Sequence, residues 1–261
     1  MLNLWNKPQR IVILLFSLVL GGLFIGILSL ILGPGTPAAI LLLDYQATPP
    51  ANYPFLYPFT VQNLMHILLF LGFGELYCRW RISERELAIV NEKLLPEDYQ
   101  VILQAHDLVP IRERVANRYD GEHGFLPSLI DLCILQFQAS RSVDQVVSVL
   151  NSSLELITHR LDLRYSILRY IVWVIPTIGF IGTVIGISLA MSLIEPQAVK
   201  QPLGEIAQSL GVAFYTTLVA LVESAILVLM LNIVQTREEL ALNRAGNYTL
   251  THLINRLYSG T

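Results

Sequence analysis

Charged residues are scarce in this chain of 261 residues: Asp, Glu, Lys and Arg make up 14% of it, while apolar residues make up 54%. Soluble domains contain about 25% charged residues, so the composition excludes an ordinary soluble protein. A net charge of -3 leaves no basic excess that would attract a nucleic acid. The two cysteines, Cys78 and Cys133, lack the spacing of a metal site and are too few for a disulfide framework.

Catalytic signatures are also missing from the sequence. It contains no nucleophile–base motif, phosphate-binding loop or nucleotide fingerprint. We therefore expect neither an enzyme nor a protein with a bound cofactor or metal.

Long segments without charge are what the chain has instead. Residues 11–32 and 170–194 contain no charged residue, and residues 206–234 contain only Glu223. About 20 apolar residues suffice to cross a bilayer as a helix. Residues 55–78 form a weaker candidate, because their polar groups must face protein rather than lipid. These polar residues are Gln62, Asn63, His66 and Glu75. The sequence predicts an all-α membrane protein with four transmembrane helices.

The distribution of basic residues predicts the orientation of these helices. Lys and Arg accumulate on the cytoplasmic side of membrane proteins. With four spans, all of the 17 Lys and Arg residues except Lys200 fall on one side of the membrane. We therefore expect a multi-pass protein of the inner membrane with both termini in the cytoplasm.

The same pattern divides the chain into four parts. Residues 1–78 are predicted to form an N-terminal membrane hairpin, and residues 79–169 a cytoplasmic helical domain. Residues 170–236 form a second membrane hairpin, and residues 237–261 a cytoplasmic C-terminal helix. Between residues 142 and 168 apolar side chains recur at intervals of three and four, which predicts a long helix that runs straight into the third span.

Small residues line one face of each of the last two spans. In the third span this face comprises Gly179, Thr183, Gly186 and Ala190, and Gly182 and Gly186 form a GxxxG pair. In the fourth span it comprises Ser209, Ala213, Thr216, Ala220, Glu223 and Ser224, with Thr217 at its edge. Small residues allow neighbouring helices to approach closely inside a membrane.

Three threonines are predicted to meet across this hairpin. Counted from the ends of their spans, Thr183 and Thr217 lie within about one helical turn of the same depth. Threonine oxygens at this depth can coordinate a partly dehydrated cation or hold a chain of waters. Alternatively, each hydroxyl bonds to a carbonyl of its own helix. We interpret Thr183, Thr216 and Thr217 as part of an ion path.

Two stretches of these spans resemble the MotA/TolQ/ExbB proton-channel family. The first is Pro176 with Gly179-Phe-Ile-Gly-Thr-Val-Ile-Gly186. The second is Gly211-Val-Ala-Phe-Tyr-Thr-Thr-Leu-Val-Ala220, followed by Asn232. The resemblance extends over residues 160–247. Four spans with a large loop between the second and third are similar to the flagellar stator arrangement. The glutamate of the ExbB branch is replaced by Val212.

The resemblance implies an ion-driven motor subunit without covalent chemistry. Five copies would enclose two copies of a single-span partner similar to ExbD, TolR or MotB, which carries the ion-binding aspartate. Thr183 and Thr217 would line the path facing that aspartate, so that residues 170–236 become the channel-lining hairpin. The transported ion, H⁺ or Na⁺, and the process that the motor drives stay open.

Glu223 needs a separate explanation, because a carboxylate inside a spanning helix costs about 2.5–3.5 kcal/mol. Our hypothesis is that it guides ions between the threonines and the cytoplasm. The alternative is a buried glutamate hydrogen-bonded to a neighbouring helix. We expect His66 and Glu75 to face other helices, with their span at the periphery of the bundle. A second hypothesis for the whole protein is a non-conducting oligomeric scaffold.

Overall fold

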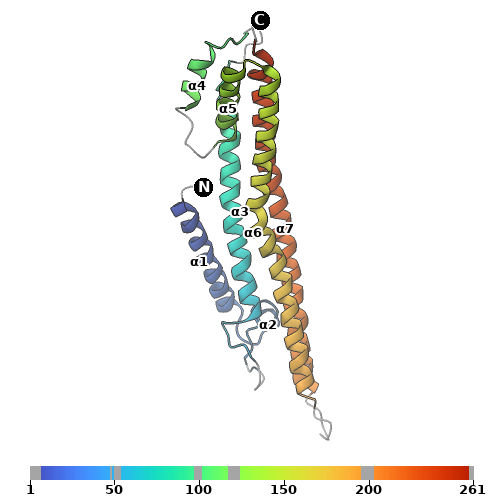
Figure 1. The fold of residues 1–261 in the computed structure, drawn as a ribbon. Helices are drawn as coiled ribbons and strands as arrows, with labels where there is room; N and C mark the ends of the chain where they lie inside the picture. Colours follow the sequence, from blue (N-terminus) through green and yellow to red (C-terminus); the bar gives the residue numbers. More distant parts are fainter. Residues whose placement is uncertain are drawn as a thin grey trace. The chain divides into compact units, whose positions relative to one another are not determined.

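The computed structural model describes residues 7–47, 49, 54–96, 102–116, 124–194 and 203–258. These residues are almost entirely helical, and no β-strand is assigned among them (Figure 1). The longer helices are α1 (Lys7–Ile31), α3 (Val61–Val90), α5 (Phe125–Ser140), α6 (Val143–Ser192) and α7 (Leu203–His252). The shorter ones are α2 (Pro37–Leu43), α4 (Leu108–Ala116) and the 3₁₀ turn η1 (Ile254–Arg256).

Four of these helices are long and apolar enough to cross a membrane: α1, α3, α6 and α7. This confirms the predicted all-α membrane protein with four candidate spans. Residues 195–202, which make up most of the predicted link between the last two spans, lie outside the described residues.

The second span begins later than residue 55, where its apolar stretch starts. Helix α3 starts at Val61, directly after Thr60. Oγ1 of Thr60 accepts a hydrogen bond of 3.2 Å from the backbone N–H of Asn63, as an N-cap residue does. The same hydroxyl donates to the carbonyl of Leu43, at 2.9 Å. Residue 60 therefore both begins α3 and fixes it to the end of α2.

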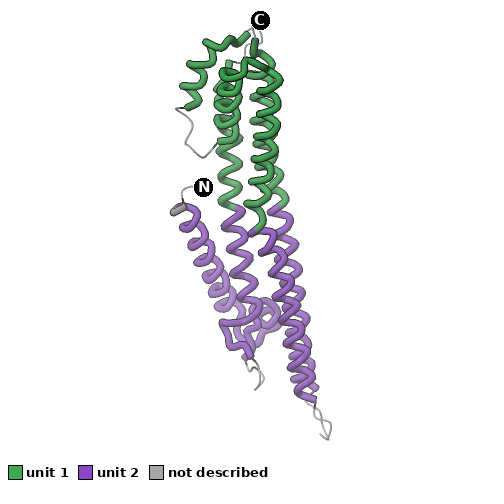
Figure 2. Tube along the Cα trace, in the orientation of Figure 1, with its two compact units in different colours: residues 1–7, 77–166, 232–261 green, residues 8–76, 167–231 purple. Residues whose placement is uncertain are grey.

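The chain divides into two compact units, which are described separately (Figure 2). Unit 1 comprises residues 1–7, 77–166 and 232–261. Unit 2 comprises residues 8–76 and 167–231, which include most of the apolar length of the four spans.

Unit 1 has a hydrophobic core built from α4, α5 and the neighbouring parts of α6 and α7. Its fully buried side chains include Leu108, Leu126, Ile130, Phe137, Val146 and Leu253. The chain end joins this core, because the backbone of Leu103 exchanges hydrogen bonds with Arg256 and Tyr258, at 2.8 and 3.1 Å. Cys133 is buried here, and burial raises the pKa of its thiol to about 12. Such a thiol is inert near neutral pH, in agreement with a structural role.

Several polar side chains inside unit 1 contact one another. The carboxylate of Glu238 is fully buried and accepts a hydrogen bond of 2.7 Å from the hydroxyl of Tyr165. The guanidinium of Arg79 lies over the ring of Tyr165, 5.8 Å from its centroid. A buried charge is tolerated where it is paired and hydrogen-bonded, so these contacts allow charge inside the helical bundle.

In unit 2, α1 packs against α3, and α6 runs antiparallel to α7 (Figure 1). A Cβ added to Gly21 of α1 would lie 3.2 Å from Phe70 of α3, and one added to Gly72 of α3 would lie 2.8 Å from Leu227 of α7. Helix α3 is therefore covered on two sides. Of its most apolar window 61% is buried, compared with 17% for α1. The expectation that the second span lies at the periphery was wrong: α1 is the more exposed helix.

The core of unit 1 allows a stability test. Phe137 is 0% exposed, so we expect Phe137→Ala to lower the free energy of unfolding by about 3–5 kcal/mol through lost burial and an unfilled cavity. Leu156→Ala, on an α6 side chain that is 58% exposed, is the matched control, with an expected change of less than about 0.5 kcal/mol. Thermal unfolding of the detergent-solubilised full chain, followed by circular dichroism, measures both. Equal melting temperatures for the two variants would contradict this core.

Candidate functional site

The contact between α6 and α7 in unit 2 depends on three glycines of α6. A Cβ added to Gly179 would lie 2.4 Å from the Cβ of Ala220, and one added to Gly186 would lie 2.6 Å from the Cβ of Ala213. At Gly182 the nearest atom would be Oγ1 of Thr216, at 2.8 Å. Because each of these distances is shorter than van der Waals contact, only glycine permits the observed approach. Ala213 and Ala220, which face these glycines, are fully buried.

The same approach brings the three predicted threonines together. The hydroxyls of Thr183 and Thr217 are in direct hydrogen-bond contact across the two helices. The carbonyl of Gly179 lies within hydrogen-bond distance of all three hydroxyls: 3.2 Å from Thr183, 3.2 Å from Thr216 and 3.3 Å from Thr217. Thr183 and Thr216 also bond to the carbonyl of Ala213, at 2.9 and 2.8 Å. We call Thr183, Thr216, Thr217 and the two carbonyls the threonine cluster.

The hydroxyls of the threonine cluster make two kinds of hydrogen bond. Some hydroxyls bond within their own helix, as Thr183 does with Gly179 and Thr216 with Ala213. The others cross between helices. Thr216 is buried, whereas Thr183 and Thr217 are half-buried. Thr183 and Thr217 therefore lie at the edge of the helix pair.

Pro176 lies inside α6, where it cannot donate a hydrogen bond to the carbonyl four residues earlier. That carbonyl belongs to Val172. The hydroxyl of Ser224 in α7 donates to it, at 3.1 Å. The proline thus exchanges one hydrogen bond within α6 for one between α6 and α7, close to the threonine cluster.

Glu223 does not lie among the threonines. Its side chain is buried, 5% exposed, and Oε1 contacts Nδ1 of His66 in α3. The other ring nitrogen of His66, Nε2, lies 2.8 Å from the carbonyl of Leu42. Glu223 therefore has the environment of a buried glutamate bonded to a neighbouring helix, which was the alternative to an ion-guiding group.

The remaining predicted residues occupy different places. Asn232 is exposed and belongs to unit 1, so it is not brought together with the threonines. Glu75 faces another helix, as expected: its Oε2 accepts a hydrogen bond of 2.9 Å from Nε of Arg10 in α1. Sequence reasoning missed the partner of Glu223. The available signal was His66 itself, a titratable side chain in a spanning helix.

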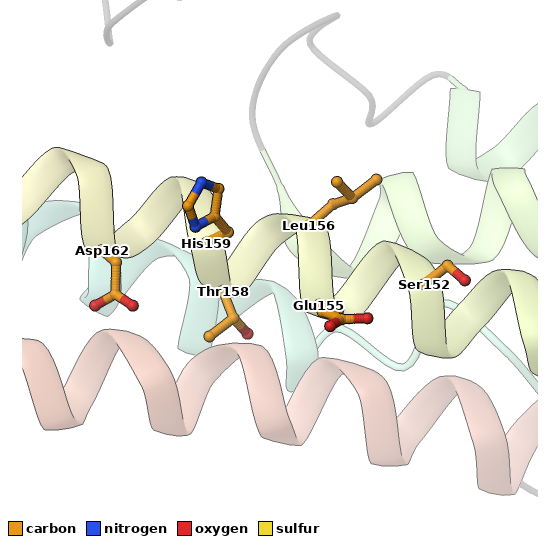
Figure 3. A pocket seen from close by; sticks show the side chains of 6 residues that line it. All are labelled: Ser152, Glu155, Leu156, Thr158, His159 and Asp162. Atoms are coloured by element: carbon orange, nitrogen blue, oxygen red, sulfur yellow. The ribbon is translucent and has the colours of Figure 1, made fainter.

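A hollow on the surface of α6 lies apart from these residues. It is lined by Ser152, Glu155, Leu156, Thr158, His159 and Asp162 (Figure 3). All six come from one helix, and His159 points away from Glu155 and Asp162 (Figure 3). Groups of three or more potential metal ligands do not occur among the described residues. The hollow therefore offers no convergent set of ligands.

Four apolar spans, with a cluster of hydroxyls between the last two, define a multi-pass membrane protein rather than a soluble one. Residues 124–245 match the family model of the MotA/TolQ/ExbB proton channel family. This match covers α5, α6 and most of α7, a little under half of the chain, and it confirms the resemblance seen in the sequence over these residues. None of the curated proteins and none of the solved structures matches the chain.

The role of the glycines can be tested directly. A Cβ at Gly186 would lie 2.9 Å from the Cα of Ala213 and 3.0 Å from the carbonyl oxygen of Ser209, both of which are backbone atoms. We expect Gly186→Ala to separate α6 from α7 and to destabilise the protein by about 1–3 kcal/mol. Gly26→Ala in α1, where no atom lies within 4 Å, is the control, and it should stabilise by up to about 1 kcal/mol. Melting temperatures that shift in the same direction would argue against the close approach.

The exchange of hydrogen bonds at Pro176 predicts a coupling between two positions. Ser224→Ala removes the donor to the Val172 carbonyl and should cost about 0.6–1.5 kcal/mol. In a Pro176→Ala background the new N–H can bond to that carbonyl, so Ser224→Ala should cost less. A double-mutant cycle on thermal stability measures this difference. If the cost is the same in both backgrounds, Ser224 does not replace the bond that proline removes.

Proposed function

We propose that this protein is the ion-conducting subunit of an ion-driven motor of the inner membrane. The observation that supports it most strongly is the threonine cluster, in which hydroxyls of α6 and α7 meet on the Gly179 carbonyl. The cluster falls within the segment that matches a proton channel family. Hydroxyls that already contact one another can transfer a proton or orient water without the reorganisation that bulk water requires.

The surroundings of the cluster favour a second chain at its open edge. Thr183 and Thr217 are half-buried, and the flanking side chains Phe180 and Phe214 are 64% and 62% exposed. An apolar surface beside a polar pair suits a membrane-spanning helix that carries one acidic residue. Our proposal is a single-span partner similar to ExbD, TolR or MotB, whose carboxyl group receives the ion from the threonines.

The proposed assembly follows the family pattern: five copies of this chain around two copies of the partner, with both termini in the cytoplasm. Ion movement along the interface would then turn one component inside the other, and long cytoplasmic extensions would transmit this work. Thr183 and Thr217 face the partner in this proposal. Gly179, Gly182, Gly186, Ala213 and Ala220 hold the two helices at the distance that the path needs, and Pro176 adjusts α6 beside it.

Replacement of one hydroxyl tests the ion path. Thr183→Val keeps the shape of the side chain but removes its hydrogen bonds, so we expect ion flux through the complex in proteoliposomes to fall about tenfold or more, which corresponds to ~1.4 kcal/mol or more in the barrier. Thr177→Val is the matched control, because the Thr177 hydroxyl only bonds to the Trp173 carbonyl of its own helix, at 2.9 Å.

The same variants separate the motor from a non-conducting scaffold. Native mass spectrometry of the purified complex should show an unchanged assembly for both variants. A scaffold would tolerate Thr183→Val completely. Unchanged flux in Thr183→Val with intact assembly would therefore contradict the proposed path.

A further inference from the structure

His66 and Glu223 form an isolated polar contact inside unit 2, between α3 and α7. The two residues are 4% and 5% exposed, and they are separated by 157 positions in the chain. The edge of the Phe24 ring from α1 covers the imidazole, with ring centroids 5.5 Å apart. The contact is thus shielded by apolar groups on a third helix.

The hydrogen-bond partners of His66 determine how many protons the pair holds. The Leu42 carbonyl, 2.8 Å from Nε2, can only accept a hydrogen bond, so Nε2 carries a proton. The contact between Nδ1 and Glu223 Oε1 then requires one further proton between the two atoms. Whether this proton resides on nitrogen or on oxygen, the pair as a whole is neutral, as a low-dielectric environment favours.

A comparison within the same helix shows why this pair differs from a structural ion pair. Glu75, also buried in α3, is bonded to Nε of Arg10. A guanidinium keeps its proton at every relevant pH, so the Arg10–Glu75 pair cannot exchange one. An imidazole, unlike a guanidinium, can give up its proton, so the His66–Glu223 pair can exchange one.

Open hydrogen-bonding positions lie next to the pair. Oε2 of Glu223 is buried and has no hydrogen-bond partner among the described residues. The same holds for both amide atoms of Gln62, which is fully buried one helical turn before His66. Buried polar atoms are rarely left without partners. These positions therefore suit a proton or a water molecule that enters and leaves.

We propose that His66 and Glu223 form a proton-binding site inside each subunit, which takes up and releases its proton through Glu223 Oε2, and that the coupling ion of this protein is H⁺ rather than Na⁺. Release removes the shared proton and leaves a neutral imidazole beside a carboxylate; uptake restores the neutral pair. Imidazole nitrogen is a poor ligand for a hard cation such as Na⁺, which prefers several oxygens. The coupling part of this proposal rests on the proposed ion-conducting function.

No hydrogen bond or ion pair joins the other described charged and titratable residues of unit 2 to this pair. Tyr45 and Tyr57 stack on one another, with ring centroids 4.0 Å apart. Asp44, which follows α2 two residues after Leu42, accepts a hydrogen bond of 2.7 Å from the Gln46 amide. Arg10 and Glu75 bind one another. Apart from Glu223, the described charged and titratable residues of α6 and α7 in unit 2 are Arg169, Tyr170, Glu205 and Tyr215. None of them contacts the His66–Glu223 pair in this structure.

Two measurements test the proposal. The first is a pH titration of the full chain with ¹⁵N-labelled histidine, in which His66→Gln identifies the His66 signals among the five histidines. We expect Nε2 to stay protonated while the Nδ1 signal changes with pH, and Glu223→Gln to shift that titration. The second is ion flux of the complex in proteoliposomes under a proton gradient, in which Glu223→Gln should reduce flux about tenfold or more.

The controls use pairs that keep or lack an exchangeable proton. The exchanged pair, His66→Glu with Glu223→His, retains one shared proton and should recover flux relative to Glu223→Gln. Glu75→Gln removes a buried carboxylate of the same helix that shares no proton, so it should leave the His66 titration unchanged. Size-exclusion profiles of all variants show whether they fold.

The outcomes distinguish this inference from the proposed function. Full flux driven by a sodium gradient alone would overturn H⁺ as the coupling ion, and a His66 titration that Glu223→Gln does not alter would overturn the proton site. Either result leaves the motor proposal standing. A wild-type complex that conducts neither ion would overturn the proposed function and the coupling with it, while the histidine titration would still decide whether the pair binds a proton.

Discussion

The close approach of α6 and α7 is the constraint on which the membrane part of this protein depends. Gly179, Gly182 and Gly186 leave no room for a side chain against the facing helix. Association of helices in a membrane gains little from the hydrophobic effect, so close packing and hydrogen bonds must hold the pair together. Gly179 contributes to both. Its lack of a side chain permits the close packing, and its carbonyl lies within hydrogen-bond distance of three threonine hydroxyls.

Much of this arrangement follows from patterns within single helices, which a sequence displays directly. Segments without charge predict spans because the bilayer has a fixed thickness. Small residues at intervals of three and four predict which faces of α6 and α7 meet, and helix rise places Thr183 and Thr217 at one level. The start of α3 at Val61 was harder to predict from the sequence, because it depends on the Thr60 hydroxyl, which bonds to both Asn63 and the distant Leu43.

The pairing of α3 with α7 could not be predicted in this way, since it joins residues that no periodicity relates. In the sequence, His66 and Glu223 are titratable residues of two different spans, and each favoured a buried environment on energetic grounds. Only the fold shows that they satisfy one another. The polar content of the second span was interpreted as a sign of weak membrane character. In physical terms it indicates a position inside the helical bundle, because such groups require protein on most sides. Helix α3 is the most buried of the four spans.

Two buried carboxylates of unit 2 have partners of different basicity, and this difference decides whether the pair can exchange a proton. Glu75 and Glu223 both lie in spanning helices and both have a nitrogen-bearing partner from another helix. Arginine fixes the charge of its pair, and so contributes to helix packing at any pH. Histidine can lose the proton that its pair shares, so the number of protons held by that pair can change. The proposed proton site requires the second kind of pair at a place where charge is costly, because there a small change in proton occupancy produces a large change in interaction energy.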